Sequence, residues 1–294
     1  MAKKILVILG PTASGKSTMA VNLAQKFNGE VISADSRQVY RGMDLGSGKI
    51  TKKEMRGVAH HLLDVVSPQK KFDVAQYRKL AYRAIARIMR NGKTPILCGG
   101  TGFYIQAVVD GIIIPAVKPD WRLRSRLELL STEKLFEKLK KLDPRRADTI
   151  DKNNRRRLIR SLEIVLKTKK PIPSLEKKSL PYPVLIIGIK KASDELKKLI
   201  AERLQKRLGM GMVMEISKLH KKGVSWKRLE EFGLEYRLVA QYLQKKLSYE
   251  EMTRFIQKES EHFAKRQMTW FKRDKRINWI KNLKEAEKLI KKFL

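Results

Sequence analysis

The feature that most constrains this chain is a glycine-rich loop close to its start. The run Gly10-Pro11-Thr12-Ala13-Ser14-Gly15-Lys16-Ser17 fits the pattern G-x-x-x-x-G-K-[ST] at every fixed position. It follows a short apolar run, residues 5–9, and opens a stretch with helical spacing. In that setting backbone N–H groups face an anion, Lys16 neutralises its charge and the Ser17 hydroxyl can ligate Mg²⁺. We therefore expect a phosphate-binding loop (P-loop), although the motif does not say whose phosphates it holds.

The remaining pattern predicts an α/β fold with a P-loop NTPase-like parallel sheet. Buried apolar runs alternate with helical patterns along the chain, as in doubly wound folds. Expected strands cover residues 5–9, 30–34, 94–99 and 184–189, and expected helices cover residues 17–27, 72–91 and 193–207. The rest of the chain, to Leu294, is expected to be a helical C-terminal region.

A second region interrupts this alternation. Between residues 118 and 179 the chain shows charged amphipathic stretches at 121–130, 132–142 and 154–166, with no strand signal. This pattern predicts an all-helical insert over 118–179. The core would then comprise residues 1–117 and 180–294.

The charge of the chain is strongly positive and unevenly distributed. The formal net charge is +36, and residues 1–110 hold 18 Lys and Arg against 7 Asp and Glu, so +11 belongs to them and +25 to residues 111–294. Lysine-rich chains can also reflect the base composition of a genome. The uneven distribution favours a polyanionic partner, with nucleic acid ahead of a membrane surface.

Cysteine usage and hydropathy favour a cytoplasmic protein. Cys98 is alone and cannot form an intramolecular disulfide, and four histidines without cysteine partners argue against zinc. The basic and apolar start of the chain passes directly into the P-loop without a cleavage pattern, and no apolar run reaches spanning length. No membrane association is expected.

The acid that would normally accompany a nucleotide-hydrolysing P-loop is missing from its usual place. Such enzymes hold Mg²⁺ with an Asp at the end of a later apolar strand, whereas the run 94–98 ends in Gly99-Gly100. The strand-end acid near the loop is Asp35. At the carboxyl edge of the sheet it could act as a metal ligand, as a general base, or only as a turn cap.

Several blocks together resemble the bacterial type of the tRNA dimethylallyltransferases, also called tRNA isopentenyltransferases. They occur in the order of that family and span nearly the whole chain. Besides the P-loop they are Ile32-Ser33-Ala34-Asp35-Ser36-Arg37-Gln38-Val39-Tyr40, His60-His61-Leu62-Leu63-Asp64, Gly99-Gly100-Thr101-Gly102-Phe103-Tyr104 and Lys265-Arg266-Gln267-Met268-Thr269-Trp270-Phe271. The resemblance implies transfer of a dimethylallyl group from dimethylallyl diphosphate to N6 of the adenosine 3′ of the tRNA anticodon, with release of diphosphate.

The same resemblance implies roles for individual residues. Asp35 would be the base, Lys16 and Ser17 would stabilise the leaving diphosphate with Mg²⁺, and Arg203 and Arg207 would reach that diphosphate. Contacts to the anticodon stem-loop would come from Asp35, Ser36, Arg37, Gln38, Thr101, Arg124, Arg156, Arg157, Leu158, Ile159 and Arg160. Thr101 can equally be read as a helix N-cap, and the run 265–271 as a stacking surface or a core face. A monomer is expected.

Other functions remain open at this point. A small-molecule kinase shares the P-loop and a helical insert, but a small substrate gives no reason for the +25 on residues 111–294. A nucleic-acid-binding P-loop ATPase explains the charge and leaves the Asp35 block unexplained. An enzyme that prenylates free adenine nucleotides would not need so large a basic surface. Adjacent His60 and His61 point in different directions and are expected to have a structural role.

Overall fold

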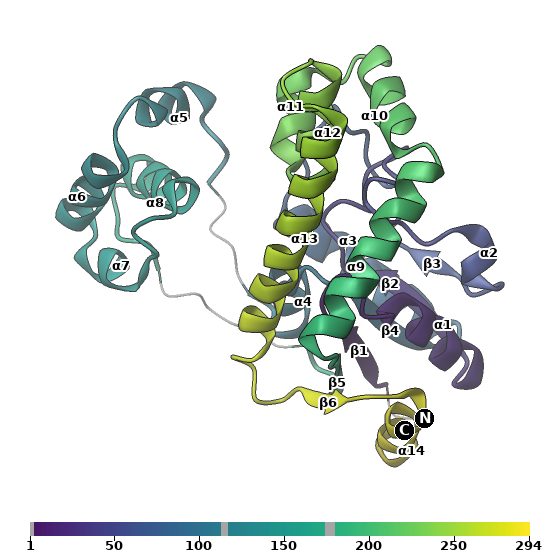
Figure 1. Cartoon of the computed structure of the whole chain (residues 1–294). Coiled ribbons are helices and arrows are strands. Elements are labelled where there is room, and N and C mark those ends of the chain that lie inside the picture. Colours follow the sequence, from purple (N-terminus) through teal and green to yellow (C-terminus); the bar gives the residue numbers. More distant parts are fainter. Residues whose placement is uncertain (1–2, 113–116, 174–179) are drawn as a thin grey trace. The chain divides into compact units, whose positions relative to one another are not determined.

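The computed structural model describes residues 3–112, 117–173 and 180–294, and these form two compact units (Figure 1). The larger unit comprises Met1–Gly111 and Ser179–Leu294, and the smaller comprises Ile112–Lys178. The insert had been predicted over residues 118–179. The smaller unit therefore begins somewhat earlier than the change in sequence pattern indicated.

The larger unit is built on one sheet of six parallel strands in the order β3-β2-β4-β1-β5-β6. The strands are β1 (Ile5–Leu9), β2 (Gly29–Ser33), β3 (His60–His61), β4 (Thr94–Gly99), β5 (Val184–Ile189) and β6 (Asn278–Ile280). The chain passes from β1 over β4 to β2, returns to β4, and later adds β5 on the other side of β1. The predicted parallel α/β fold is thus confirmed.

The C-terminal region is helical, as expected, except for the short strand β6. β6 pairs with β5 through Gly188 and Trp279, and α14 (Leu283–Phe293) follows it. β6 has three residues, too few to show a period of two. Its pairing with β5 stabilises a segment that carries little strand signal of its own.

Alternating residues of β1 enter two different hydrophobic cores, one on each face of the sheet. Ile5, Val7 and Leu9 pack with α3 (Val74–Arg90) and α4 (Gly102–Val109) on one face. Leu6 and Ile8 pack with α1 (Lys16–Lys26) and α14 on the other. This burial on both faces explains why β1 is apolar throughout.

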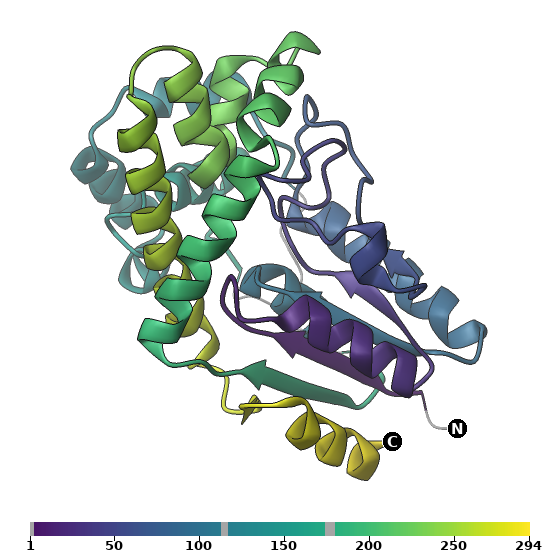
Figure 2. The same cartoon turned by 45° about the vertical axis from the view of Figure 1, so that its right-hand side comes forward.

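Five further helices continue the first of these cores. They are α9 (Ser193–Gly209), α10 (Met212–Lys221), α11 (Trp226–Phe232), α12 (Leu234–Leu243) and α13 (Tyr249–Phe271). α9 and α13 run side by side in Figure 2, and both contribute residues to the site described below. The short α2 (Lys52–Met55) begins at a capping box formed by Thr51 and Glu54.

The smaller unit contains α5 (Trp121–Glu128), α6 (Thr132–Leu142), α7 (Pro144–Thr149) and α8 (Arg155–Thr168). Each helix begins at a polar side chain that accepts a hydrogen bond from a backbone N–H of the first turn. These caps are Asp120, Ser131, Asp143 and Asn154. The unit has a hydrophobic core of its own, with Leu135, Leu139, Leu158 and Leu162 fully buried.

No helix in the described ranges is both long enough and apolar enough to cross a membrane.

Candidate active site

Three loops meet at the carboxyl edge of the sheet. The P-loop follows β1, the loop of Asp35 follows β2, and the loop of Thr101 follows β4, which lies between the other two strands. The register pairs Leu9 with Gly99 and Ser33 with Cys98, so the three strands end at the same level. Asp35 is therefore brought to the side of the P-loop, as its position after β2 predicted.

The two glycines at the end of β4 leave no space for side chains. A Cβ on Gly99 would lie 2.2 Å from the carbonyl oxygen of Ala34, and one on Gly100 would lie 2.3 Å from Nε2 of Gln267. Ala34 also donates its N–H to Cys98 and accepts one from Thr101, which binds the two strand ends together. An acid at the end of β4 is thus excluded by close backbone packing.

Two residues of the P-loop adopt the left-handed conformation, which Gly15 accepts without cost and Ala13 adopts although it carries a Cβ. Gly15, the N-cap of α1, has φ 83°, and Ala13 has φ 60°. The Thr12 N–H donates to Oε1 of Gln267 at 2.8 Å, and Nε2 of the same side chain donates to the Gly100 carbonyl at 2.8 Å. Gln267, from α13, is 6% exposed and joins the P-loop to the loop after β4.

The role of Gln267 was not predicted from the sequence. The run 265–271 had been interpreted as a stacking surface or a core face, and Phe271 is indeed buried. The hydrogen bonds of Gln267 reach Thr12, 255 positions away, and Gly100, 167 positions away. No local sequence pattern predicts contacts over such distances. The one hint in the sequence was the residue type itself, because Gln267 places an amide side chain between basic and apolar neighbours on an expected helix.

Lys16 lies inside the loop with Nζ 3.1 Å from the Pro11 carbonyl. Burial and the nearby Arg203 cation lower the pKa of Lys16, and the Asp35 carboxylate partly opposes this shift. Burial raises the pKa of the Cys98 thiol to about 12, so that thiol is neutral at ordinary pH. Ser14 is 3% exposed, and its buried hydroxyl has no hydrogen-bond partner in the described part of the chain.

The loop that follows β2 is held by hydrogen bonds from its backbone N–H groups to the side chains of Asp35 and Thr101. Oδ1 of Asp35 accepts the N–H groups of Arg37 at 2.8 Å and Gln38 at 3.3 Å, and the Thr101 hydroxyl accepts the N–H of Ser36 at 3.0 Å. Thr101 stands at the N-cap of α4 but makes no capping hydrogen bond with its side chain. Its hydroxyl fixes the Asp35 loop instead.

Two of the residues predicted to contact tRNA, Arg37 and Gln38, form hydrogen bonds within the protein. Nε of Arg37 donates to the Phe232 carbonyl at 2.8 Å, and burial lowers the pKa of this arginine. The Gln38 amide donates to the Gly48 carbonyl at 3.3 Å and accepts the Ser33 hydroxyl at 3.2 Å. Both residues hold neighbouring loops in the structure as it stands.

Arg203 and Arg207 project from α9 toward the same edge. Nη1 of Arg203 lies 3.4 Å from the Thr12 hydroxyl and Nη2 donates to the Gly48 carbonyl at 2.8 Å. Arg207 lies one turn later and pairs with Glu235 at 2.6 Å. The structure thus places Arg203 beside the P-loop and Arg207 farther along the same helix.

The adjacent histidines are held by separate structural contacts. Nε2 of His61 lies 2.6 Å from Glu30, which also pairs with Lys93 at 2.8 Å, and Nδ1 of His60 lies 2.9 Å from the Val58 carbonyl. Within the described ranges no group of three or more His, Cys, Asp or Glu side chains is arranged to hold a metal ion.

The arginines predicted in the insert fall into two groups. Arg124 and Arg160 both pair with Glu163, whose side chain is fully buried, and Arg124 does so through Nε at 2.8 Å and Nη2 at 2.6 Å. Arg156 and Arg157 are exposed. Their side chains are therefore accessible to a phosphate group.

Leu158 and Ile159 need a correction. They were included among the candidate contacts because they lie within the arginine run, but they are only 0% and 6% exposed and pack in the core of the insert. Arg156 and Arg157, on the same helix, are exposed instead. The Leu158 and Ile159 side chains therefore stabilise the fold of the insert and are unavailable to RNA.

Comparison with known proteins agrees with this arrangement. A sequence profile described as IPP transferase matches residues 38–274. The chain belongs to the IPP transferase family. It is 40% identical to tRNA dimethylallyltransferase 1 of Geotalea uraniireducens over 99% of this chain and 98% of that protein, and 42% identical to the protein of the same name from Syntrophus aciditrophicus over 95% and 94%.

Solved structures give the same family. The tRNA isopentenylpyrophosphate transferase of Bacillus halodurans superposes with a TM-score of 0.74 at 36% identity, covering 99% of this chain and 95% of that one. A eukaryotic dimethylallyltransferase acting on tRNA superposes with a TM-score of 0.77 at 28% identity, covering 92% and 70%. The family resemblance first seen in the sequence motifs is confirmed over nearly the full length.

Proposed function

We propose that this protein transfers the dimethylallyl group of dimethylallyl diphosphate to the N6 amine of an adenosine in tRNA. The observation that carries the proposal is the pairing of a complete P-loop with Asp35 at the same sheet edge, where packing excludes an acid after β4. A phosphate site next to a carboxylate suits a reaction in which diphosphate leaves and a proton is removed.

In the proposed reaction the bond between C1 of the dimethylallyl group and the diphosphate oxygen breaks, and the diphosphate departs with the electron pair. A bond forms between that carbon and N6 of the adenine. Asp35 accepts the proton that the attacking amine loses. Oδ1 is committed to two backbone N–H groups, so Oδ2 is the oxygen that takes the proton.

The leaving diphosphate would be stabilised by groups that are already in position. The P-loop N–H groups, the Lys16 ammonium and the Arg203 guanidinium surround one place. Such fixed charges favour the transition state most when negative charge develops on the leaving group.

We also propose that Ser17 helps to hold Mg²⁺. Ser17 lies half-buried in the first turn of α1, and a magnesium ion commonly combines few protein ligands with phosphate oxygens and water. When bound, the ion would supply positive charge to the diphosphate. Asp35 could be a second protein ligand only at the expense of its role as base.

The nucleic-acid partner is proposed to be the anticodon stem-loop. The charge of +25 on residues 111–294 and the exposed Arg156 and Arg157 suit phosphate contacts. The target adenine must leave its stack to reach Asp35, at a cost of a few kcal/mol. We propose that the protein acts in the cytoplasm as a monomer.

The direct test is to incubate the purified protein with unmodified tRNA, dimethylallyl diphosphate and Mg²⁺, and to digest the RNA for nucleoside mass spectrometry. The proposal expects one adenosine next to the anticodon to gain one dimethylallyl group, with one diphosphate released for each. Modification of free adenine nucleotides in preference to tRNA would contradict the choice of substrate.

A further inference from the structure

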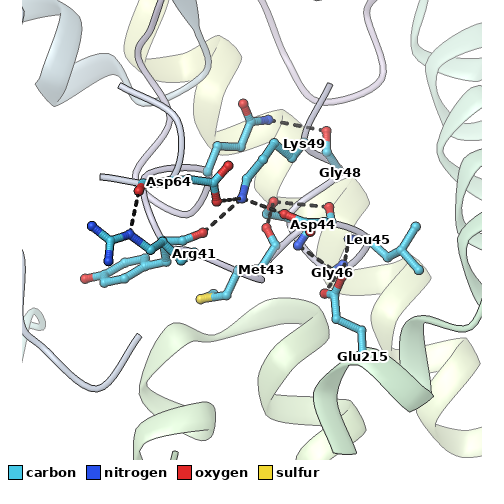
Figure 3. Close-up of polar contacts among 12 residues, drawn as sticks. Arg41, Met43, Asp44, Leu45, Gly46, Gly48, Lys49, Asp64 and Glu215 are labelled. Carbon is cyan, nitrogen blue, oxygen red and sulfur yellow. Dashed lines mark hydrogen bonds and ion pairs between the residues drawn. The ribbon is translucent and has the colours of Figure 1, made fainter. Parts of the chain in front are cut away.

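A loop outside the motifs discussed so far contacts Arg203 and Arg207 of α9. We call residues 41–49 the 41–49 loop. The Glu215 side chain, from α10, accepts hydrogen bonds from three successive backbone N–H groups of this loop (Figure 3). They are those of Asp44 at 3.0 Å, Leu45 at 2.6 Å and Gly46 at 3.0 Å.

Both oxygens of Glu215 are fully used. Oε2 accepts from Asp44 and Leu45, whereas Oε1 accepts from Gly46 and from the Tyr236 hydroxyl at 3.2 Å. Consecutive N–H groups around a carboxylate form a small anion-binding concavity. Here the protein fills that concavity with its own acid.

The other side of the 41–49 loop contacts the arginines of α9. Nη2 of Arg203 donates to the Gly48 carbonyl at 2.8 Å, and Nη1 of Arg207 donates to the carbonyls of Leu45 and Gly46 at 3.0 and 3.2 Å. The same peptide segment thus accepts from α9 with its oxygens and donates to Glu215 with its nitrogens.

Close packing makes the position of Arg203 depend on this loop. A Cβ on Gly48 would lie 2.0 Å from Nη2 of Arg203. Nη1 of the same guanidinium reaches the Thr12 hydroxyl of the P-loop. Arg203 is therefore held between the P-loop and the 41–49 loop, and a shift of the loop moves the guanidinium.

A second contact closes the far end of the loop. Lys49, with its side chain 5% exposed, donates to Asp44 and Asp64 at 2.6 Å each and to the Tyr40 carbonyl at 2.9 Å (Figure 3). This contact fixes where the loop ends. Glu215 fixes the middle, where the Leu45 and Gly46 carbonyls accept from Arg207. A turn in which the Gly48 N–H donates to the Leu45 carbonyl at 3.0 Å joins this middle part to Gly48, the partner of Arg203.

We propose that Glu215 is a positioning residue for the leaving-group site, acting through the 41–49 loop to aim Arg203 at the diphosphate. This inference rests on the proposed function in so far as Arg203 binds the diphosphate of the prenyl donor. Glu215 itself does not touch the ligand. Its carboxylate sets the conformation of the peptide segment that orients the guanidinium.

The charge and both oxygens of Glu215 are needed for this role. Glu215→Gln keeps the shape of the side chain but offers one accepting oxygen, and its NH₂ group would face N–H or O–H donors. If the NH₂ group takes the place of Oε1, the Tyr236 hydroxyl can turn to accept from it, but the Gly46 N–H cannot, so at least one favourable contact becomes a donor-to-donor contact. The loop should then leave its position, and Arg203 should lose its fixed partner at Gly48.

The test compares the wild-type protein with Glu215→Gln and with a matched control, Glu195→Gln, which changes an exposed acid of α9. Titration calorimetry with inorganic diphosphate and Mg²⁺ is expected to show about tenfold weaker binding for Glu215→Gln and no change for the control. In the transfer reaction, KM for dimethylallyl diphosphate should rise by a similar factor, with KM for tRNA unchanged.

A double-mutant cycle separates positioning from general damage. In an Arg203→Ala background, Glu215→Gln should weaken diphosphate binding no further, because the group that it positions is gone. An equal loss in both backgrounds would overturn the proposal, as would wild-type affinity in Glu215→Gln.

Gly48→Ala provides a second route if Glu215→Gln does not fold. It keeps the Glu215 carboxylate, but its methyl group would meet Nη2 of Arg203 and the φ of +59° at this position strains any residue with a Cβ, so the loop and Arg203 should shift together. Diphosphate affinity should fall as in Glu215→Gln; unchanged affinity would also overturn the proposal. Calorimetry measures diphosphate binding without turnover, so it tests the coupling of Glu215 and Arg203 separately from the reaction. A wild-type protein that binds diphosphate but does not modify tRNA would contradict the proposed function, and the coupling could still be measured.

Discussion

At Asp35, the two carboxylate oxygens have different surroundings. Oδ1 binds the backbone of its own loop, and within the described chain no donor is assigned to Oδ2. An oxygen that is fixed in place but not occupied is what a general base requires. The same Asp35 loop is held from the side by the Thr101 hydroxyl.

Replacing Asp35 with Asn should separate chemistry from binding. The amide keeps an oxygen for the two backbone N–H groups but cannot accept the proton, so kcat should fall by about 10²- to 10⁴-fold. Diphosphate affinity, measured by calorimetry, should stay within a factor of about three. The exposed Asp194 on α9, changed to Asn, serves as the control. Full turnover in Asp35→Asn would remove Asp35 as the base.

Lys16 gives a prediction about pH. Burial and the neighbouring Arg203 lower the pKa of Lys16 below its ordinary 10.5. The ammonium is therefore present at low pH and is lost as the pH rises through this lowered pKa. Diphosphate binding should weaken in alkaline solution before an ordinary lysine would titrate.

Calorimetric titrations with diphosphate from about pH 7 to pH 10 test this expectation. Lys16→Arg carries a cation that does not titrate in that range, so it serves as the control for titration of the ligand itself. The wild-type protein should lose affinity more steeply than the variant. The same slope in both proteins would rule out Lys16 as the titrating group.

Among the elements, β4 ends in Gly99, a glycine whose lack of a side chain lets β4 pack closely against the end of β2. Its end packs so closely against Ala34 that Gly99→Ala would place a methyl group 2.2 Å from a carbonyl oxygen. The ends of β2 and β4 must then separate, at a cost of about 1–3 kcal/mol. Asp35 follows directly after β2, so kcat should fall as well.

Thermal unfolding and initial rates measure these two effects. Gly209→Ala is a suitable control, because no atom lies near its Cβ position and its φ is not in the left-handed region. It should leave the rate unchanged and should not lower the stability, because Ala at an unstrained helical position stabilises by up to about 1 kcal/mol. A Gly99→Ala protein with unchanged stability would contradict the close approach of the two strands.

In the insert, α8 carries a buried acid that holds two arginines. Burial alone would raise the pKa of Glu163, but hydrogen bonds from Arg124, the Asp120 N–H and Arg160 outweigh it and hold that pKa below the ordinary range. Because the folded pKa is depressed, this stabilisation is present above the ordinary pKa of 4.5 and is lost as the pH falls through the folded value.

Removing the acid should unfold the insert more easily. Glu163→Ala leaves two guanidinium groups without their carboxylate, which costs about 3–5 kcal/mol at neutral pH. Limited proteolysis should then cut within residues 117–173 much faster than in the wild-type protein. The exposed Glu137 on α6, changed to Ala, should have no effect. Equal cleavage rates for Glu163→Ala and the wild-type protein would show that this cluster does not stabilise the insert.

The elements that could be predicted from the sequence are those with a strong local pattern. Residues 5–9, 94–99 and 184–189 are continuous apolar runs, and the structure has strands at the same positions. Asp35 could be placed at the site because strand ends meet at one edge of a parallel sheet. β6 escaped prediction because three residues show no periodicity.

Side chains that act over long sequence distances could not be predicted. Gln267 and Glu215 each bond to the backbone of a loop more than 160 residues away, and Arg124 turns toward the buried Glu163 of another helix. Such contacts arise only when the fold brings the segments together. The sequence shows the residue types, whereas their partners depend on tertiary structure.

For the whole molecule, the charge of +36 predicts how tRNA binding responds to salt. Each phosphate neutralised by a Lys or Arg releases bound counterions, so the affinity should fall steeply with ionic strength, with log Kd linear in log salt concentration. Filter binding at several salt concentrations gives the slope. Arg156→Ala with Arg157→Ala should reduce it by about two phosphate contacts. An affinity independent of salt would contradict a nucleic-acid partner.

The central claim is that the P-loop holds a leaving diphosphate and that the prenyl group goes to tRNA. A single-turnover reaction with dimethylallyl diphosphate labelled on both the prenyl group and the phosphate tests it most directly. The account predicts that the prenyl label enters tRNA in step with release of labelled diphosphate, and that labelled ATP transfers nothing to tRNA. Transfer of phosphate from ATP, without transfer of the prenyl label, would contradict it.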